Sequence, residues 1–120
     1  MTNSEFRDVM EERMTKYAID VFKLLRTLPY DISVKVIAQQ LGKSASSIGA
    51  NYHESNRSES RGDFIHKISI SLKEANESMY WFKVMGGLFE NHEEMRRLAQ
   101  ETYELRNVLQ SILRTAKSRR

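Results

Sequence analysis

Apolar residues recur every three or four positions along four long stretches of the chain. In the first stretch, residues 4–28, this spacing is typical of one face of an amphipathic helix. Pro29 follows directly, and because proline disfavours helix in the residue before it, the helix is predicted to end at Leu28. The predicted inner face consists of Met10, Met14, Tyr17, Val21, Leu24 and Leu28.

The second stretch runs to about Ser55, and either Asp31 or Ser33 can cap its beginning. It is rich in small residues, and Gly42 and Gly49 lie a heptad apart. Glycine weakens a helix interior by about 1 kcal/mol, so its presence needs a reason. A local kink is one explanation, and close approach of another helix is the one we favour. The predicted apolar stripe is Val34, Ile37, Leu41 and Ile48.

A polar segment, residues 56–62, separates this helix from the third, and Ser60 with Asp63 resembles a capping pair. The pair Gly86-Gly87 is predicted to end the third helix. Its predicted seam is Ile65, Ile68, Leu72, Ala75, Met79 and Phe82. Further apolar residues fall outside that seam, namely Phe64, Tyr80, Trp81, Val84 and Met85. The helix is therefore predicted to be covered on more than one side, by its own bundle or by another subunit.

The fourth stretch has the most regular spacing, and Asn91 with Glu94 indicates its beginning. Its stripe is Met95, Leu98, Thr102, Leu105, Leu109, Ile112 and Ala116. Steps of three and four suit left-handed bundle packing. Four helices joined by short turns predict an all-α, up-down-up-down, antiparallel four-helix bundle, with residues 1–120 forming a single domain.

Composition agrees with this prediction and narrows the chemistry. The chain has one proline, five glycines and no cysteine, which excludes disulfides and thiolate chemistry. We expect a cytoplasmic protein, because the first residues show no signal peptide and no stretch is apolar enough to span a membrane. The net charge of +3 favours anionic partners slightly.

Sites for metals or catalysis are weakly indicated. Asp63 and His66 have the spacing of a di-iron bundle, but no second acid-x-x-His pair accompanies them. The carboxylates of Glu74 and Glu77 lie three residues apart, a spacing that a solvated helix face explains as well as acid–base chemistry does. We therefore predict a protein that is not an enzyme, with no cofactor, no metal and no small-molecule substrate.

A basic face on the fourth helix is the strongest functional signal among the residues. At about 100° per residue, six side chains share an arc of about 80° that contains no acid. Arginines with an interleaved tyrosine suit phosphate contacts and base stacking, so the face is a candidate nucleic-acid-binding site. A solvated face whose arginines pair with acids of a neighbouring helix is the alternative. The six residues are Arg96, Tyr103, Arg106, Gln110, Arg114 and Lys117, and Arg119 and Arg120 extend the charge.

Residues 36–82 resemble the bacterial four-helix-bundle proteins related to those encoded in 23S rRNA intervening sequences. One matching segment has the form S-x-x-x-N-x-x-E and consists of Ser47, Asn51 and Glu54. A polar turn and a helix that opens with Asp63-Phe64-Ile65 follow it. The last matching segment consists of Leu72, Glu74, Ala75, Glu77, Ser78, Tyr80 and Trp81. Many of these positions are polar, and bundle periodicity alone does not explain them.

The resemblance implies a left-handed antiparallel bundle that assembles into a ring-like homopentamer. Relatives in this family include accessory proteins of retroelements that bind a reverse transcriptase and nucleic acid, and no catalytic activity is attached to the family. The leading prediction is therefore an oligomeric bundle that binds RNA or a reverse transcriptase-type nucleoprotein. The alternative is a protein-binding scaffold module without affinity for nucleic acid.

Polar residues around the second turn form a further candidate cluster: Asn51, Glu54, Arg57 and Arg61. Glu54 is predicted to pair with either arginine and hold the helical hairpin closed. The alternative is a functional cluster at one end of the bundle.

Overall fold

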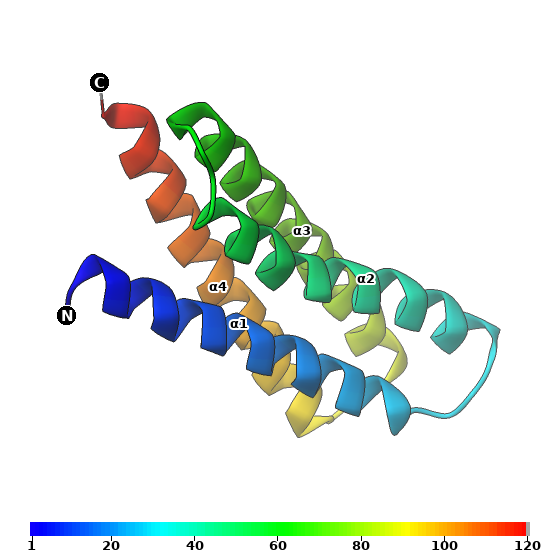
Figure 1. The fold of residues 1–120 in the computed structure, drawn as a ribbon. Helices are drawn as coiled ribbons and strands as arrows, with labels where there is room; N and C mark the ends of the chain where they lie inside the picture. The colour runs from blue at the N-terminus through cyan, green and yellow to red at the C-terminus, as the bar shows by residue number, and fades with distance from the viewer. Residues whose placement is uncertain (120) are drawn as a thin grey trace.

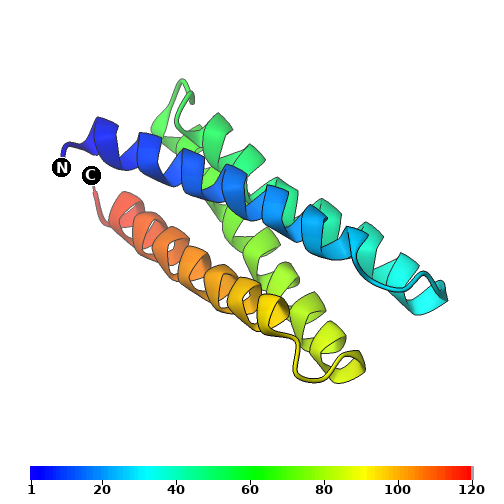
Figure 2. The same cartoon turned by 90° about the horizontal axis from the view of Figure 1, so that it is seen from below.

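Four antiparallel helices make up the molecule, which a computed structural model describes for residues 1–119 (Figure 1). They are α1 (Asn3–Arg26), α2 (Ile32–Ser55), α3 (Arg61–Leu88) and α4 (Glu93–Ser118). Successive helices run in opposite directions, and the two termini lie at the same end of the bundle (Figure 2). The predicted all-α four-helix bundle is confirmed.

Capping side chains define where the helices begin. Asp31 caps α2, where its carboxylate accepts a hydrogen bond from the Val34 amide at 2.9 Å. Ser60 caps α3 in the same way, through the amide of Asp63 at 3.1 Å. Each contact satisfies one of the amides that a helix N-terminus leaves without a partner. Both caps were among the sequence-based predictions.

Three predicted boundaries differ from the structure. The first helix ends at Arg26, before Leu28, because the Thr27 hydroxyl donates to the carbonyl of Leu24 and closes the last turn. The third helix continues through both glycines to Leu88. The cap of α4 is His92, whose Nδ1 accepts from the Met95 amide. Asn91 instead takes a positive φ of 57°, a conformation that asparagine tolerates in a tight turn.

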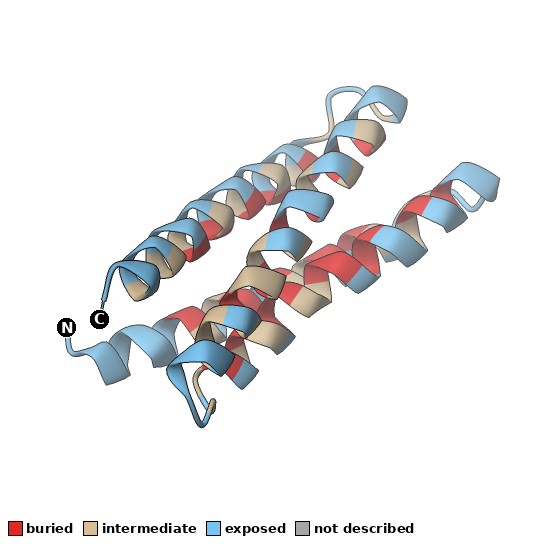
Figure 3. Ribbon diagram, turned by 90° about the horizontal axis from the view of Figure 1, so that it is seen from above, coloured by how far each residue is buried: buried red, intermediate tan, exposed pale blue. Residues whose placement is uncertain are grey.

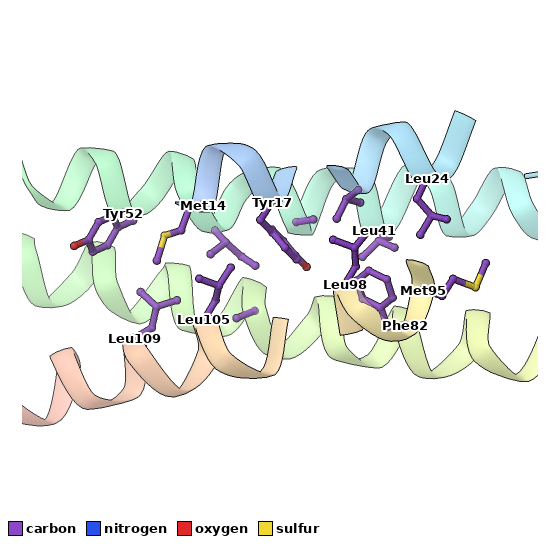
Figure 4. Close-up of a cluster of buried hydrophobic side chains, with 14 of the residues drawn as sticks. Met14, Tyr17, Leu24, Leu41, Tyr52, Phe82, Met95, Leu98, Leu105 and Leu109 are labelled. Carbon is purple, nitrogen blue, oxygen red and sulfur yellow. The ribbon is translucent and has the colours of Figure 1, made fainter. Parts of the chain in front are cut away.

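Buried residues on the inner faces of all four helices form one core along the bundle (Figure 3). α2 and α3 form the most extensive interface, followed by α3 and α4, whereas α1 and α4 touch over a shorter stretch. Figure 4 shows the aromatic ring of Tyr17 in the middle of this core, between the leucines of α4 and the residues of α2. The predicted inner faces of α1 and α4 are buried at every position from Met10 to Leu24 and from Met95 to Leu109.

The inner face of α3 differs from the predicted seam. Ser71 and Ser78 are fully buried, whereas Leu72 and Met79 are half-buried at the edge. The Ser71 hydroxyl donates to the carbonyl of Ile48 on α2 at 2.7 Å. Ser78 shares a hydrogen bond of 2.8 Å with Ser44 of α2, so its hydroxyl is also satisfied. Small side chains with satisfied hydroxyls let α2 and α3 pack closely, and this rotates the larger apolar residues outward.

The two glycines of α2 lie against α1, so the predicted close approach of another helix is confirmed. A Cβ atom on Gly49 would lie 3.2 Å from the Cβ of Met14 and 3.6 Å from the Met14 carbonyl carbon. A Cβ atom on Gly42 would lie 2.9 Å from the ring of Phe22, which is partly exposed. The small residues of α2 therefore serve packing within the subunit.

None of the helices within residues 1–119 combines the length and the apolar composition that crossing a lipid bilayer requires.

Candidate nucleic-acid interface

The basic face of α4, predicted from the sequence, is a continuous exposed surface along one flank of the helix. Five of its side chains are exposed and Arg106 is half-buried. The face consists of Arg96, Tyr103, Arg106, Gln110, Arg114 and Lys117. Arg119 is exposed just beyond the helix, whereas Arg120 lies outside the described residues. The structure therefore leaves this face accessible to a partner.

Two acids of α4, Glu101 and Glu104, lie on another flank, where they bind α1. Arg13 of α1 donates from Nε and Nη2 to the two oxygens of Glu101, each at 2.7 Å. The same guanidinium reaches Glu104 at 3.1 Å. Near the other end of α1, Arg97 joins Asp20 to Glu94. Because these carboxylates hold α1 against α4, the two helices meet through a charged seam, and the basic face remains free of acids.

The cations of the basic face have no acidic partner in the part of the chain that the structure describes. Among residues 1–119, none of Arg96, Arg106, Arg114 and Lys117 forms an ion pair with a carboxylate. Other arginines of this chain do form such pairs, namely Arg13 and Arg97 in the charged seam. Pairing with acids of a neighbouring helix, the alternative explanation for this face, is therefore not what the structure shows for these four side chains.

Arg106 is held in place by its neighbours on the helix. Its guanidinium carbon lies 5.5 Å from the centre of the Tyr103 ring, within the range of a cation–π contact. One terminal nitrogen donates to the side-chain oxygen of Gln110 at 3.0 Å. The Nε atom is buried and has no hydrogen-bond partner among the described residues. Tyr103 itself remains 45% exposed, so part of its ring faces solvent.

The residues around the second turn do not form one cluster, and the predicted pairing of Glu54 is wrong. Glu54 pairs with Lys67 of α3 at 2.9 Å instead of with either arginine. Arg61 donates to the carbonyl of Ala116 in the last turn of α4, and Asn51 donates to the carbonyl of Ser47 within α2. The Glu54–Lys67 pair does join the two helices of the hairpin, so the structural role of Glu54 is retained with a different partner.

Arg57, the remaining member, belongs to a charged group centred on Glu11 of α1, which the sequence analysis missed. The Glu11 carboxylate accepts from Arg57 at 2.9 Å, from Asn56 at 2.9 Å and lies 3.1 Å from Nδ1 of His53. The hydrogen bond from Arg57 lowers the pKa of Glu11, and Asn56 and His53 add to this effect against the opposing influence of burial. No local pattern signals this group, because Glu11 lies more than forty residues from Asn56 and Arg57.

The weaker candidates for catalysis are placed as follows. Burial raises the pKa of the Glu74 carboxyl, and the neighbouring Glu77 raises it further. Asp63 and His66 are both exposed in the first turns of α3. Within residues 1–119, no three His, Asp or Glu side chains lie close enough together to hold a metal ion.

The fold defines this protein as a small four-helix-bundle protein. Residues 8–111 match the family described as 23S rRNA-intervening sequence protein, and the chain belongs to that family. It is also similar to a crystal structure from Bacteroides thetaiotaomicron, described as a protein of unknown function from the S23 ribosomal protein family. That protein is 30% identical, with a TM-score of 0.78, and the alignment covers 86% of this chain and 96% of the other. A search of curated proteins finds no significant match.

Proposed function

We propose that this protein binds RNA, either free or within a nucleoprotein partner, through the basic face of α4, and that it does so as a homo-oligomer without catalysing a reaction. The observation that carries the proposal is the set of four exposed or half-buried cations on that face that have no carboxylate partner among residues 1–119. Membership of a family described by 23S rRNA intervening sequences is consistent with an RNA partner.

The chemistry of the face favours phosphate contacts over base readout. Arginine and lysine side chains that have no acid nearby neutralise phosphates and release counterions, which supplies most of non-specific affinity. Arg106 is held in a fixed orientation on this face, because its guanidinium lies against the Tyr103 ring and donates to Gln110. The exposed part of the Tyr103 ring offers a surface on which an unpaired base would stack.

Self-association is proposed through the outer surface of α3. Tyr80 is 58% exposed and its ring meets that of Trp81 edge to face, with centroids 5.2 Å apart. The indole Nε1 of Trp81 is already buried, without an acceptor among residues 1–119, whereas Leu88 is exposed on the same helix. A second subunit would cover Tyr80 and Leu88. The surface is smaller than the sequence predicted, because Met85 is part of the core.

Oligomerisation would strengthen a weak contact with RNA. Each subunit of a ring would present the same basic face, and linked contacts raise avidity by about 10²–10⁴ without new chemistry. The pentameric state is proposed on the family resemblance. A scaffold that binds only proteins is the second candidate, and the exposed aromatic surface of α3 is the observation that favours it.

The test of RNA binding is a gel shift at two salt concentrations with a structured and a single-stranded RNA. We expect binding that weakens with salt, with a log–log slope near −0.7 for each phosphate neutralised on a single strand. The variant Arg106→Gln/Arg114→Gln/Lys117→Gln should lose three such contacts, so the magnitude of its log–log salt slope should fall by about two. Its helicity should be unchanged, because none of these residues lies in the core.

A matched control removes three exposed cations elsewhere, through Lys23→Gln/Arg26→Gln/Lys35→Gln. Because both triple variants lose the same net charge, equal weakening would contradict a site on α4. If wild-type protein retains no RNA at low salt, the proposal fails and the scaffold function replaces it.

Self-association is tested by light scattering against the subunit mass of 14.1 kDa. Tyr80→Glu should dissociate the assembly, and Tyr30→Glu, at an exposed position between α1 and α2, should leave it intact. A particle of one subunit mass for wild-type protein at micromolar concentration would contradict the proposed oligomer.

A further inference from the structure

Both termini lie at the same end of the bundle (Figures 1 and 2). A hollow of about 310 Å³ opens at this end. All four helices contribute to its wall, through the beginning of α1, the end of α2, the beginning of α3 and the end of α4. Its volume falls at the lower end of the range for small-molecule sites, about 300–1,000 Å³. No part of the basic face of α4 lines it.

The wall combines an aromatic side with a polar floor. Phe6 of α1 and Phe64 of α3 line the hollow, and Phe6 is 37% exposed even though it carries a large apolar ring. Two flat rings on the wall suit a flat ligand, because aromatic groups stack with a gain beyond their buried area.

The floor of the hollow carries a polar pair. Tyr52 is 1% exposed, and its hydroxyl lies at the hollow beside the side chain of Asn56. Figure 4 shows the oxygen of Tyr52 at the end of the core, directed away from Met14. Asn56 also lines the hollow, and its amide nitrogen is already used by Glu11, which leaves its oxygen as an acceptor. An aliphatic ligand would offer these polar atoms no hydrogen bond, whereas the edge of a nucleobase presents both donors and acceptors to them.

The charge of the wall is positive. Arg7 and Arg119 line the hollow, no aspartate or glutamate does, and neither arginine forms an ion pair with a carboxylate among residues 1–119. Burial raises the pKa of the Tyr52 hydroxyl and the charge of Glu11 raises it further, while the hydrogen bond with the Asn56 side chain and the charge of Arg7 lower it, so both charges act on the floor of the hollow. The arrangement is complementary to a phosphate group, which arginine binds through paired N–H donors.

We propose that this hollow is a binding site for a nucleotide, either free or unpaired within an RNA strand, with the base against Phe6 and Phe64 and the phosphate on Arg7. Tyr52 and Asn56 would then hydrogen-bond the edge of the base. This inference does not depend on the proposed basic face. At about 100° per residue, the α4 residues that line the hollow lie roughly opposite that face.

The experiment is a calorimetric titration of the full chain with uridine 5′-monophosphate and adenosine 5′-monophosphate. Uridine, inorganic phosphate and a single-stranded hexanucleotide are titrated in parallel. Arg7→Gln should weaken binding of the monophosphates about tenfold and leave binding of uridine unchanged, because it removes only the phosphate partner. Tyr52→Phe should weaken both the nucleotides and uridine, and Arg26→Gln serves as the control on the same helix.

The outcomes separate the two sources of the ligand. Saturable binding of a monophosphate that Arg7→Gln weakens supports a free nucleotide. Binding of the hexanucleotide alone, weakened by Arg7→Gln but retained by the triple variant of α4, supports a nucleotide within a strand. The proposal is overturned if no nucleotide or hexanucleotide binds up to about 5 mM. It is equally overturned if Arg7→Gln behaves as Arg26→Gln does, or if only the triple variant of α4 loses binding.

Discussion

Replacing Thr102 by valine would remove one hydroxyl from the middle of the bundle and leave another without a partner. Thr102 uses its own proton to donate to the carbonyl of Leu98 at 2.7 Å. The Tyr17 hydroxyl, 2.6 Å away, must therefore donate to the Thr102 oxygen. Both residues are buried, so no water replaces the lost acceptor. Valine has nearly the shape of threonine, and the substitution therefore isolates the hydrogen bond from packing.

The structure predicts unequal costs for the two partners. Thr102→Val leaves a buried donor unpaired, which should lower the free energy of unfolding by about 1–3 kcal/mol. Rotation of the Tyr17 hydroxyl toward Ser78, which lies beside it, would bring the loss to the lower end of this range. Tyr17→Phe removes the donor and should cost about 0.5–1.5 kcal/mol, since Thr102 keeps its bond to the backbone. The double variant should be at least as stable as Thr102→Val alone, because no polar group is then left unpaired.

Urea denaturation followed by circular dichroism measures all four proteins. The protein concentration must be the same throughout, because association shifts apparent stability. The reasoning would be refuted if the double variant lost the sum of the two single losses, since that result would mean that the two hydroxyls contribute independently.

Three further predictions concern packing and pH. Gly49→Ala should be less stable than Gly42→Ala by about 1–2 kcal/mol, as measured by urea denaturation of both variants. The new methyl group meets the Cβ of Met14, which moves only with the backbone of α1, in the first case and the movable ring of Phe22 in the second. Burial raises the pKa of Tyr17, so wild-type stability should fall above about pH 10 as the unfolded chain ionises first, and Tyr17→Phe should reduce this fall. Arg57 lowers the pKa of Glu11, so the stability that Glu11 contributes is present above its unfolded pKa and lost as pH falls through its folded pKa. Glu11→Gln should therefore lower the free energy of unfolding by less than about 1 kcal/mol at pH 7 and leave it unchanged near pH 2. Equal losses at the two pH values would contradict this.

Helix number, order and inner faces were predictable because they depend on local spacing. The faces of α1 and α4 lie as the three-and-four pattern predicts, and the caps at Asp31 and Ser60 follow from side chains that reach only three residues along the chain. The basic face of α4 was predictable for the same reason, since its residues share one helix. Its lack of acidic partners was not, because acids on any other helix were candidates.

The rotation of α3 shows where local spacing fails. Its sequence offers apolar residues over a wide arc, so several rotations bury a comparable apolar area. The hydrogen bonds of Ser71 and Ser78 with α2 select the rotation observed. From the sequence alone, a serine is predicted to be exposed. Burial of its hydroxyl becomes favourable only when another helix supplies a hydrogen-bond partner.

The sequence by itself therefore determined the four helices, their order and the separation of charge around α4, because each depends on residues within one or two turns of a helix. The tertiary structure alone decided that Glu54 pairs with Lys67, that Glu11 gathers Arg57 and its neighbours, and that four helix ends enclose a hollow beside Tyr52. These features join residues that are distant in the chain, and helix packing sets their distances to within a few ångströms. The sequence shows which acidic and basic residues could form ion pairs. The packing of the helices decides which of these residues lie close enough to do so.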